Sequence, residues 1–207
     1  MTTTRIDPAA PADTRLTVLI HDALRRDLQR SREVLAATPA PGPGQRAALG
    51  RHLGWMMRFL HDHHATEDAG LFPMVRDRDP AAAGVLDRMH ADHEVVEPAI
   101  AAVEQAAAAG DPATLLAAVV QLEEALLPHL RREEDEVLPL VSATFTDGEL
   151  RRWDEEVNIR PKPVRQLGRE CHWILDGLGS DDRDFVLHLV PAPQRAVLLL
   201  GLSLIHI

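Results

Sequence analysis

Two copies of one motif place a histidine and a glutamate at helical spacing. The first copy starts at His63 and reads HHATEDAGLFPMV, and the second starts at His129 and reads HLRREEDEVLPLV. Aligned without a gap, both copies carry His first, Glu at the fifth place and Pro at the eleventh. Residues four apart lie on one face of a helix. The sequence therefore predicts two side-chain pairs, His63 with Glu67 and His129 with Glu133.

Apolar residues before each histidine indicate where these pairs point. They recur at helical spacing in both copies, which predicts amphipathic helices: Met56, Phe59, Leu60; Leu122, Leu126. Imidazole and carboxylate groups turned toward an apolar interior are costly unless something pairs them. A metal ion is the simplest partner. Imidazole and carboxylate without thiolate suit iron, manganese or zinc, and ligand type alone does not select among them.

Four helices are predicted to position the motifs, over residues of about 14–37, 45–72, 81–109 and 112–138. The proline- and glycine-rich segment 38–44 cannot continue a helix. Pro73 and Pro139 are expected to end the second and fourth helices. Short loops between four helices favour an antiparallel up-down four-helix bundle.

The two remaining helices each contribute a histidine at the same height. His21 lies roughly two turns into the first helix and His93 about three turns into the third, both on apolar stripes. In an up-down bundle these helix starts meet the ends of the second and fourth helices, where His63 and His129 lie. The predicted metal ligands are His21, His63, Glu67, His93, His129 and Glu133. His90 stays open as a seventh ligand.

Other polar side chains near the motifs are expected to be solvated. His61 and His64 flank His63 and are predicted to point away from its face. Four acids are expected on solvated helix faces: Asp68, Glu134, Asp135 and Glu136. An acid beside the site could orient a ligating imidazole, and the candidates are Asp22, Asp62 and Glu94.

The donor set is large enough for two ions. Two-metal sites hold their ions ~3.5–4 Å apart, and carboxylates from opposite helices could bridge such a pair. With two six-coordinate ions and one oxo or hydroxo bridge, some coordination positions stay open. Those positions would suit O2, peroxide or nitric oxide.

The composition favours an all-α chain and excludes several classes. The chain has 207 residues, no Tyr and 3% aromatic residues, and helix-forming Ala, Leu, Glu and Arg are plentiful. A formal net charge of -10 argues against nucleic-acid binding through phosphate contacts. The single Cys171 excludes an internal disulfide and a cysteine-rich zinc site. No signal peptide is visible, and the apolar run 196–205 is too short to span a bilayer. We therefore expect a cytoplasmic protein without a membrane partner.

Taken together, these motifs resemble the hemerythrin-like, HHE cation-binding family, and the resemblance covers about residues 14–142. The matching elements are His21, HHATE at 63–67, DHE at 92–94 and HLRREE at 129–134. The resemblance implies a four-helix bundle around a non-haem, usually di-iron, centre with an open site for oxygen. It also implies roles for the predicted ligands: His21, His63, His93 and His129 as terminal ligands, Glu67 and Glu133 as bridging carboxylates.

The chain departs from the oxygen-carrying members of that family. Those have His-x3-His on the third helix, whereas Met89 and Glu97 stand four residues either side of His93 here. Their last carboxylate is an Asp five residues after the fourth-helix histidine. Here Glu133 stands at four and Glu134 at five. The chain is more similar to the broader bacterial, actinobacterial-type branch.

The flanking segments are predicted separately from the bundle. Residues 1–13 are expected to be a disordered lead-in, and 143–201 a C-terminal helical extension with helices at about 146–157, 164–178 and 181–189. TDGE at 146–149 predicts a capping box that opens the first of these. Cys171 is expected to be a buried thiol beside an exposed His172. The last six residues, LSLIHI at 202–207, match what a transposon-end sequencing adapter encodes, and we interpret them as an artefact without a ligand role for His206.

Four functions remain open from the sequence. The favoured one is a di-iron protein that binds O2 or a related oxidant for sensing, storage or detoxification. The others are a di-iron enzyme acting on peroxide or nitric oxide, an iron-handling or cluster-repair protein, and a metal-free helical interaction module. The two His-x3-Glu pairs argue against the last. The lack of Tyr, which could supply a proton over an open site, favours binding over turnover. The protein partner is unknown.

Overall fold

The computed structural model describes residues 7–190 and residue 195. These residues are helical apart from turns and connections, and their only β pairing is one isolated bridge between Pro11 and Thr146. The all-α prediction is therefore confirmed. Residues 202–207, interpreted as adapter, lie outside the described residues.

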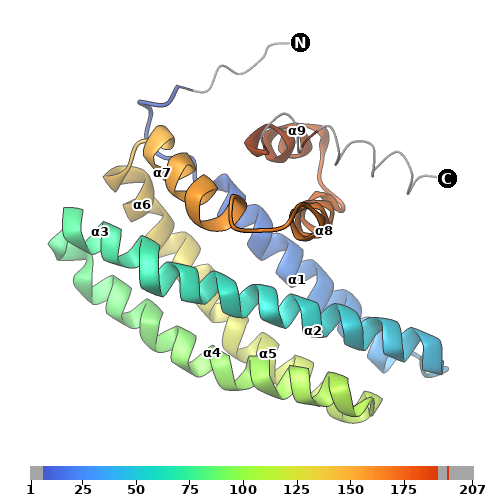
Figure 1. Ribbon diagram of the computed structural model, residues 1–207. Helices are drawn as coiled ribbons and strands as arrows, with labels where there is room; N and C mark the ends of the chain where they lie inside the picture. The colour runs from blue at the N-terminus through green and yellow to red at the C-terminus, as the bar shows by residue number, and fades with distance from the viewer. Residues whose placement is uncertain (1–6, 191–194, 196–207) are drawn as a thin grey trace. The chain divides into compact units, whose positions relative to one another are not determined.

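The chain divides into two compact units, residues 24–144 and residues 1–23 with 145–207. The larger unit is a bundle of four helical segments, which Figure 1 shows running alongside one another. Its elements are α1 from residue 24 onward (α1 spans Arg15–Ala36), α2 (Pro43–Thr66), η1 (Glu67–Leu71), α3 (Phe72–Arg78), η2 (Pro80–Ala82), α4 (Ala83–Ala109), α5 (Pro112–Arg132), η3 (Glu133–Val137) and α6 (Leu138–Thr144).

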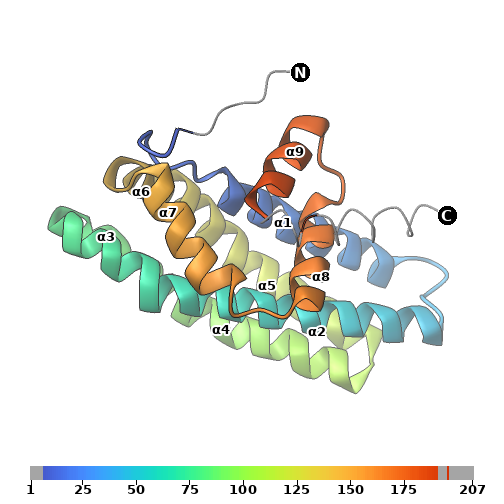
Figure 2. The same cartoon turned by 45° about the horizontal axis from the view of Figure 1, so that its top comes forward.

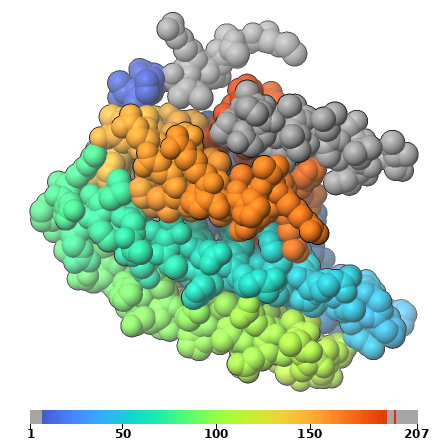
Figure 3. Space-filling view, viewed as in Figure 1, coloured from blue at the N-terminus to red at the C-terminus, as the bar shows by residue number. Residues whose placement is uncertain are grey.

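Leucine and methionine stripes hold the bundle together. One face of each helix is fully buried, at the three- and four-residue spacing of an amphipathic helix: Leu24, Leu28; Leu53, Met56, Leu60; Leu86, Met89; Leu122, Leu126, Leu130. Burying each such side chain stabilises the fold by about 1.5–3 kcal/mol. In the space-filling view, α2 and α4 lie against each other over much of their length (Figure 3).

The break between α4 and α5 has a local cause. Gly110 ends α4 with a left-handed φ of 78°, a conformation that glycine adopts without steric cost. Asp111 then caps α5, because its carboxylate accepts a hydrogen bond of 2.8 Å from the backbone N–H of Thr114. Pro112 occupies the first turn, where its missing N–H is not needed.

The second and fourth helical segments do not end at their prolines, contrary to our prediction. Each passes through a π turn, η1 or η3, and continues as α3 or α6. The N–H of Phe72 donates to the carbonyl of Glu67, five residues back, and the residue after it is Pro73. Leu138 and Pro139 repeat this arrangement in η3. The wider turn shifts the hydrogen-bond register so that each proline enters the first turn of a new α-helix, where it is tolerated.

The helical segment Pro112–Thr144 is long and apolar enough, by length and composition alone, to cross a membrane. A core helix of a bundle passes the same test. Leu122, Leu126 and Leu130 of this segment are fully buried in the described structure, and the segment carries His129 and Glu133. We therefore assign it to the core of the bundle.

A contact between His52 and Asp27 links α2 to α1 and makes stability depend on acid pH. His52 Nε2 lies 2.7 Å from Asp27 Oδ2, and Arg26 donates to Asp27 Oδ1 at 2.9 Å. Burial raises the pKa of Asp27, but the hydrogen bonds from His52 and Arg26 outweigh it and lower the pKa from 3.8 to about 2. A depressed carboxyl pKa stabilises the fold above the unfolded value and loses that contribution as the pH falls through the folded value.

We predict that Asp27→Asn lowers the free energy of unfolding by about 2 kcal/mol at neutral pH and removes part of its decline between pH 4 and pH 2. Urea unfolding followed by circular dichroism at several pH values measures both effects. Asp77→Asn, at an exposed carboxylate on α3, is the matched control and should leave the acid profile unchanged. Equal acid profiles for the wild type and Asp27→Asn would contradict the prediction.

The smaller unit contains α7 (Asp147–Asp154), η4 (Glu155–Ile159), α8 (Val164–Leu175) and α9 (Ser180–Leu189), which confirms the three C-terminal helices predicted. A short connection joins α8 to α9 (Figure 2). Backbone hydrogen bonds from Asp147 and Gly148 to the carbonyls of Ala10 and Pro8 give residues 7–13 an order that the sequence did not predict.

Cys171 on α8 is buried as predicted, and burial raises the pKa of its thiol to about 11. A thiol with this pKa holds little thiolate at neutral pH and is unreactive. His172 beside it is half-buried rather than exposed.

The predicted capping box at the start of α7 is present. The N–H of Glu149 donates to Thr146 Oγ1 at 3.3 Å, and the N–H of Thr146 donates to Glu149 Oε2 at 2.9 Å. We predict that Thr146→Ala lowers the free energy of unfolding by ~1 kcal/mol, because the cap hydrogen bond is lost. Thr146→Ser keeps the hydroxyl and should recover most of this loss in urea unfolding. A serine variant as unstable as the alanine variant would argue against the cap.

Candidate metal centre

Two buried carboxylates occupy equivalent places in the bundle. Glu67 and Glu133 each begin a π turn, at the point where α2 and α5 give way to η1 and η3. Glu67 is 3% exposed and Glu133 is fully buried. π turns inside α-helices are frequent at functional sites because they redirect side chains. The repeat in the sequence is thus also a repeat in local structure.

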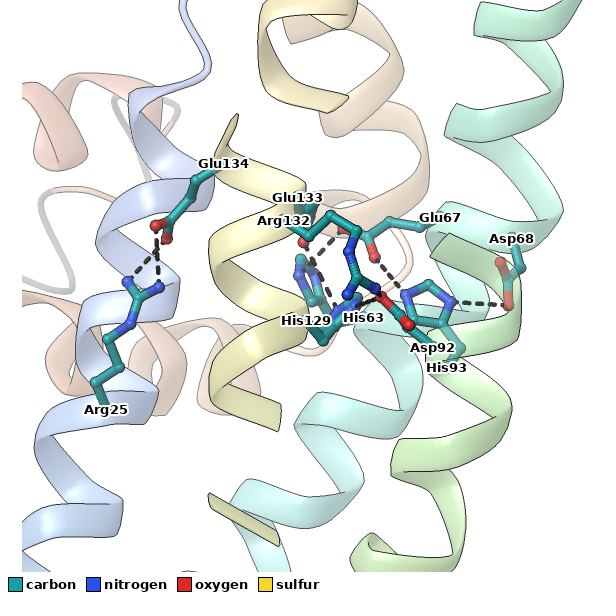
Figure 4. Close-up of polar contacts among 10 residues, drawn as sticks. All are labelled: Arg25, His63, Glu67, Asp68, Asp92, His93, His129, Arg132, Glu133 and Glu134. Carbon is teal, nitrogen blue, oxygen red and sulfur yellow. Dashed lines mark hydrogen bonds and ion pairs between the residues drawn. The ribbon is translucent and has the colours of Figure 1, made fainter. Parts of the chain in front are cut away.

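The imidazoles of three further residues surround these carboxylates (Figure 4). Glu67 Oε1 lies 3.2 Å from His63 Nε2, and Glu67 Oε2 lies 3.5 Å from His93 Nε2. Glu133 Oε2 lies 3.9 Å from His129 Nε2. The two oxygens of Glu67 therefore face imidazoles from two different helices, α2 and α4.

Without a bound cation, the buried carboxylates of Glu67 and Glu133 are energetically unfavourable beside each other. Burial, and then the neighbouring charge of Glu133, raise the pKa of Glu67 well above 4.5. Oε2 of Glu67 is buried and accepts no hydrogen bond of ordinary geometry within the described residues. Two carboxylates at close range in an apolar interior need a shared proton or a cation. The electrostatics of these buried residues therefore fit a bound metal cation.

One carboxylate outside this group, that of Asp68, orients an imidazole, and a second, that of Asp92, lies near another. Asp68 Oδ2 lies 3.0 Å from His93 Nδ1, and Asp92 Oδ2 lies 3.9 Å from His129 Nδ1. Asp92 also forms an ion pair with Arg132. A carboxylate on Nδ1 fixes the ring orientation and leaves Nε2 free to bind a metal.

The acid that the structure places against an imidazole is not among those predicted. Asp68 contacts His93 instead of lying on a solvated face, and all three predicted candidates are exposed: Asp22, Asp62 and Glu94. Glu134 is also half-buried, since Arg25 donates two hydrogen bonds to its carboxylate at 2.8 and 2.9 Å. Asp135 is exposed as predicted, whereas Glu136 is half-buried and pairs with Arg88. No spacing along the chain links Asp92 to His129, because the two residues lie on different helices, α4 and α5.

His64 is the largest correction to the predicted site. We expected a solvated side chain, but His64 is only 3% exposed, and its ring centroid lies 4.1 Å from that of His93 and 5.0 Å from that of His129. A signal was present in the sequence. His64 stands three residues before Glu67, which is also same-face spacing, and the aligned residue of the second copy is the fully buried Leu130.

The remaining histidines differ in position. His61 is exposed and lies 2.9 Å from Glu97, as a solvated residue should. The side chain of His90 is 61% exposed and lies 3.2 Å from Asp68, outside the buried group. His21 is buried on the part of α1 that belongs to the smaller unit, so its role as a ligand stays a prediction.

A helical bundle with converging, buried imidazoles and carboxylates defines a protein with a candidate site for metal cations. The model of the hemerythrin HHE cation binding domain matches residues 14–141, and the chain belongs to this family. The resemblance inferred from the sequence motifs is thus confirmed. No curated protein and no solved structure matches the chain significantly.

Proposed function

We propose that the chain is a non-haem di-iron protein that binds O2 or a related small oxidant, for sensing, storage or detoxification in the cytoplasm. The observation that carries this proposal is the position of Glu67. Its two oxygens face imidazoles of two different helices, at 3.2 and 3.5 Å, while Glu133 lies near enough to raise its pKa. A carboxylate placed in this way suits a bridge between two cations.

The residues of the chain have separate tasks in this proposal. His63, His93 and His129 supply nitrogen donors, and Glu67 and Glu133 supply the negative charge that offsets two cations. Asp68 orients one imidazole through Nδ1. Leu60, Met89 and Leu126, which stand three or four residues before His63, His93 and His129, are fully buried. Iron, when bound, would supply reversible electron transfer and open coordination positions for a small ligand.

Binding is favoured over turnover by the composition of the chain. The sequence contains no Tyr, and Cys171, with its raised pKa, is a poor proton or electron donor at neutral pH. A di-iron enzyme acting on peroxide or nitric oxide, and an iron-handling protein, are the alternatives that the following measurement separates.

The test is metal analysis of the anaerobically purified full chain, with absorption spectra before and after exposure to air. About two irons per chain, with charge-transfer bands that appear with oxygen and fade on its removal, would support reversible binding. Irreversible oxidation with consumption of added peroxide would support the enzyme. Ready transfer of iron to a chelator or an apo-acceptor would support iron handling. Absence of bound metal after loading with iron, manganese or zinc would refute all three.

A further inference from the structure

We infer that His64, His93 and His129 form a three-imidazole ligand set for one of the two cations, with His64 as a direct ligand. This inference rests on the proposed function and specifies its site. The three residues come from α2, α4 and α5, and each offers a ring nitrogen within 4.8 Å of the others. The His64 and His93 rings are stacked with their centroids 4.1 Å apart, and the His129 ring lies edge-on to both, at 5.0 and 4.8 Å.

Burial makes a solvated role for this group impossible. The three residues are 3%, 5% and 1% exposed, respectively, for His64, His93 and His129. Imidazoles are rarely brought together in an apolar interior, because each ring carries a polar nitrogen lone pair that must be satisfied. One cation accepts a lone pair from each of three neutral imidazoles at once, and three histidines with an open position are an established ligand set.

The ring on α4 is oriented for this role. Asp68 Oδ2 lies 3.0 Å from Nδ1 of His93, which directs Nε2 of that ring toward the site, whereas Asp92 Oδ2 lies 3.9 Å from Nδ1 of His129, beyond hydrogen-bond distance. Glu67 Oε2 lies 3.5 Å from His93 Nε2, so this carboxylate reaches the three-imidazole set as well. Its other oxygen faces His63 at 3.2 Å.

The two cation positions are therefore chemically different. The two copies of the motif are matched in Glu67 and Glu133, but the first copy has His64 where the second has Leu130. Ring nitrogens of His64, His93 and His129 lie within 4.8 Å of one another, with His93 beside Glu67 Oε2, whereas Glu67 Oε1 faces His63. We expect two cations to bind in two steps with distinct affinities rather than as an equivalent pair.

The second copy of the motif supplies the test variant. Leu130 is fully buried at the place that corresponds to His64, so His64→Leu introduces a side chain that this bundle already accommodates in an equivalent position. His64→Gln is the second variant, with a polar side chain that cannot replace the imidazole geometry. His61→Leu is the matched control, since His61 is exposed and on the same helix.

The experiment is an anaerobic titration of the metal-free full chain with Co²⁺, followed by visible absorption and calorimetry. We expect two binding steps in the wild type and in His61→Leu. In His64→Leu and His64→Gln we expect one step to weaken by more than about 100-fold, since the loss of an outer partner alone costs 10–100-fold. The other step should persist.

Two results would overturn the inference. One is unchanged affinity and an unchanged cobalt spectrum in both His64 variants, which would leave the proposed di-metal function standing without His64. The other is X-ray absorption of the wild type with one equivalent of Co²⁺ that shows fewer than three imidazole nitrogens, a readout that needs no variant. Failure of the wild type to bind any metal would refute the proposed function itself.

Discussion

Glu67→Gln is expected to abolish the binding of two cations while making the metal-free protein more stable. The amide keeps the shape of the side chain but removes its negative charge and one of the two oxygens that would hold the cations. Without metal, the same change relieves a buried carboxylate whose pKa is raised by burial and by Glu133. Metal content should fall from about two ions per chain to one or fewer, and the metal-free melting temperature should rise.

This prediction is specific because the two expected effects have opposite signs: metal binding is weakened, whereas the metal-free protein is stabilised. A substitution that merely damaged the fold would lower both metal content and stability. Glu33→Gln, at an exposed glutamate on α1, should change neither quantity. Mass spectrometry measures the metal content of each variant. Thermal melts of matched metal-free and metal-loaded samples measure its stability. A Glu67→Gln variant that retains two tightly bound ions would show that the carboxylate is not a bridge.

Removal of the metal is expected to destabilise the protein most at high pH. Bound cation at 100 times its dissociation constant contributes about 2.7 kcal/mol per site to the free energy of unfolding. In the metal-free protein the pKa of Glu67 lies above its unfolded value of 4.5. A group with a raised pKa stabilises the fold fully below the unfolded value, and this contribution is lost as the pH rises through the folded value.

The stability of the metal-free chain should therefore decline from about pH 5 upward, and loading with metal should flatten or reverse this slope. Thermal melts at several pH values, with and without a chelator, measure the two slopes. Glu67→Gln provides the internal comparison, because a neutral amide has no titration to contribute. An identical pH slope in the metal-free wild type and in Glu67→Gln would contradict this account.

The sequence was sufficient for the features that depend on neighbours along one helix. His63 with Glu67 and His129 with Glu133 were predictable, since a separation of four residues places two side chains on one helical face. The leucine and methionine stripes showed which face turns inward. The capping box at Thr146 was equally readable, because a cap is satisfied by residues three positions away.

The prolines were misread for a reason that concerns hydrogen-bond register. Pro73 and Pro139 cannot donate a backbone hydrogen bond, and in a regular helix this would end the segment. The π turns at Glu67 and Glu133 shift the register so that no donor is required at either place. A hydrogen-bond shift of one residue leaves no periodic pattern in the amino-acid sequence.

What the sequence by itself determined is the family, the all-α bundle and the two carboxylates, all of which rest on spacing within single helices. Only the tertiary structure decided that His64 joins His93 and His129, and that Asp68 lies beside Nδ1 of His93. His63 and His64 both lie within one turn of Glu67, so helical geometry allows either to face inward. That His64 reaches the site as well as His63 depends on where α4 and α5 place their imidazoles, and packing between the helices sets that distance.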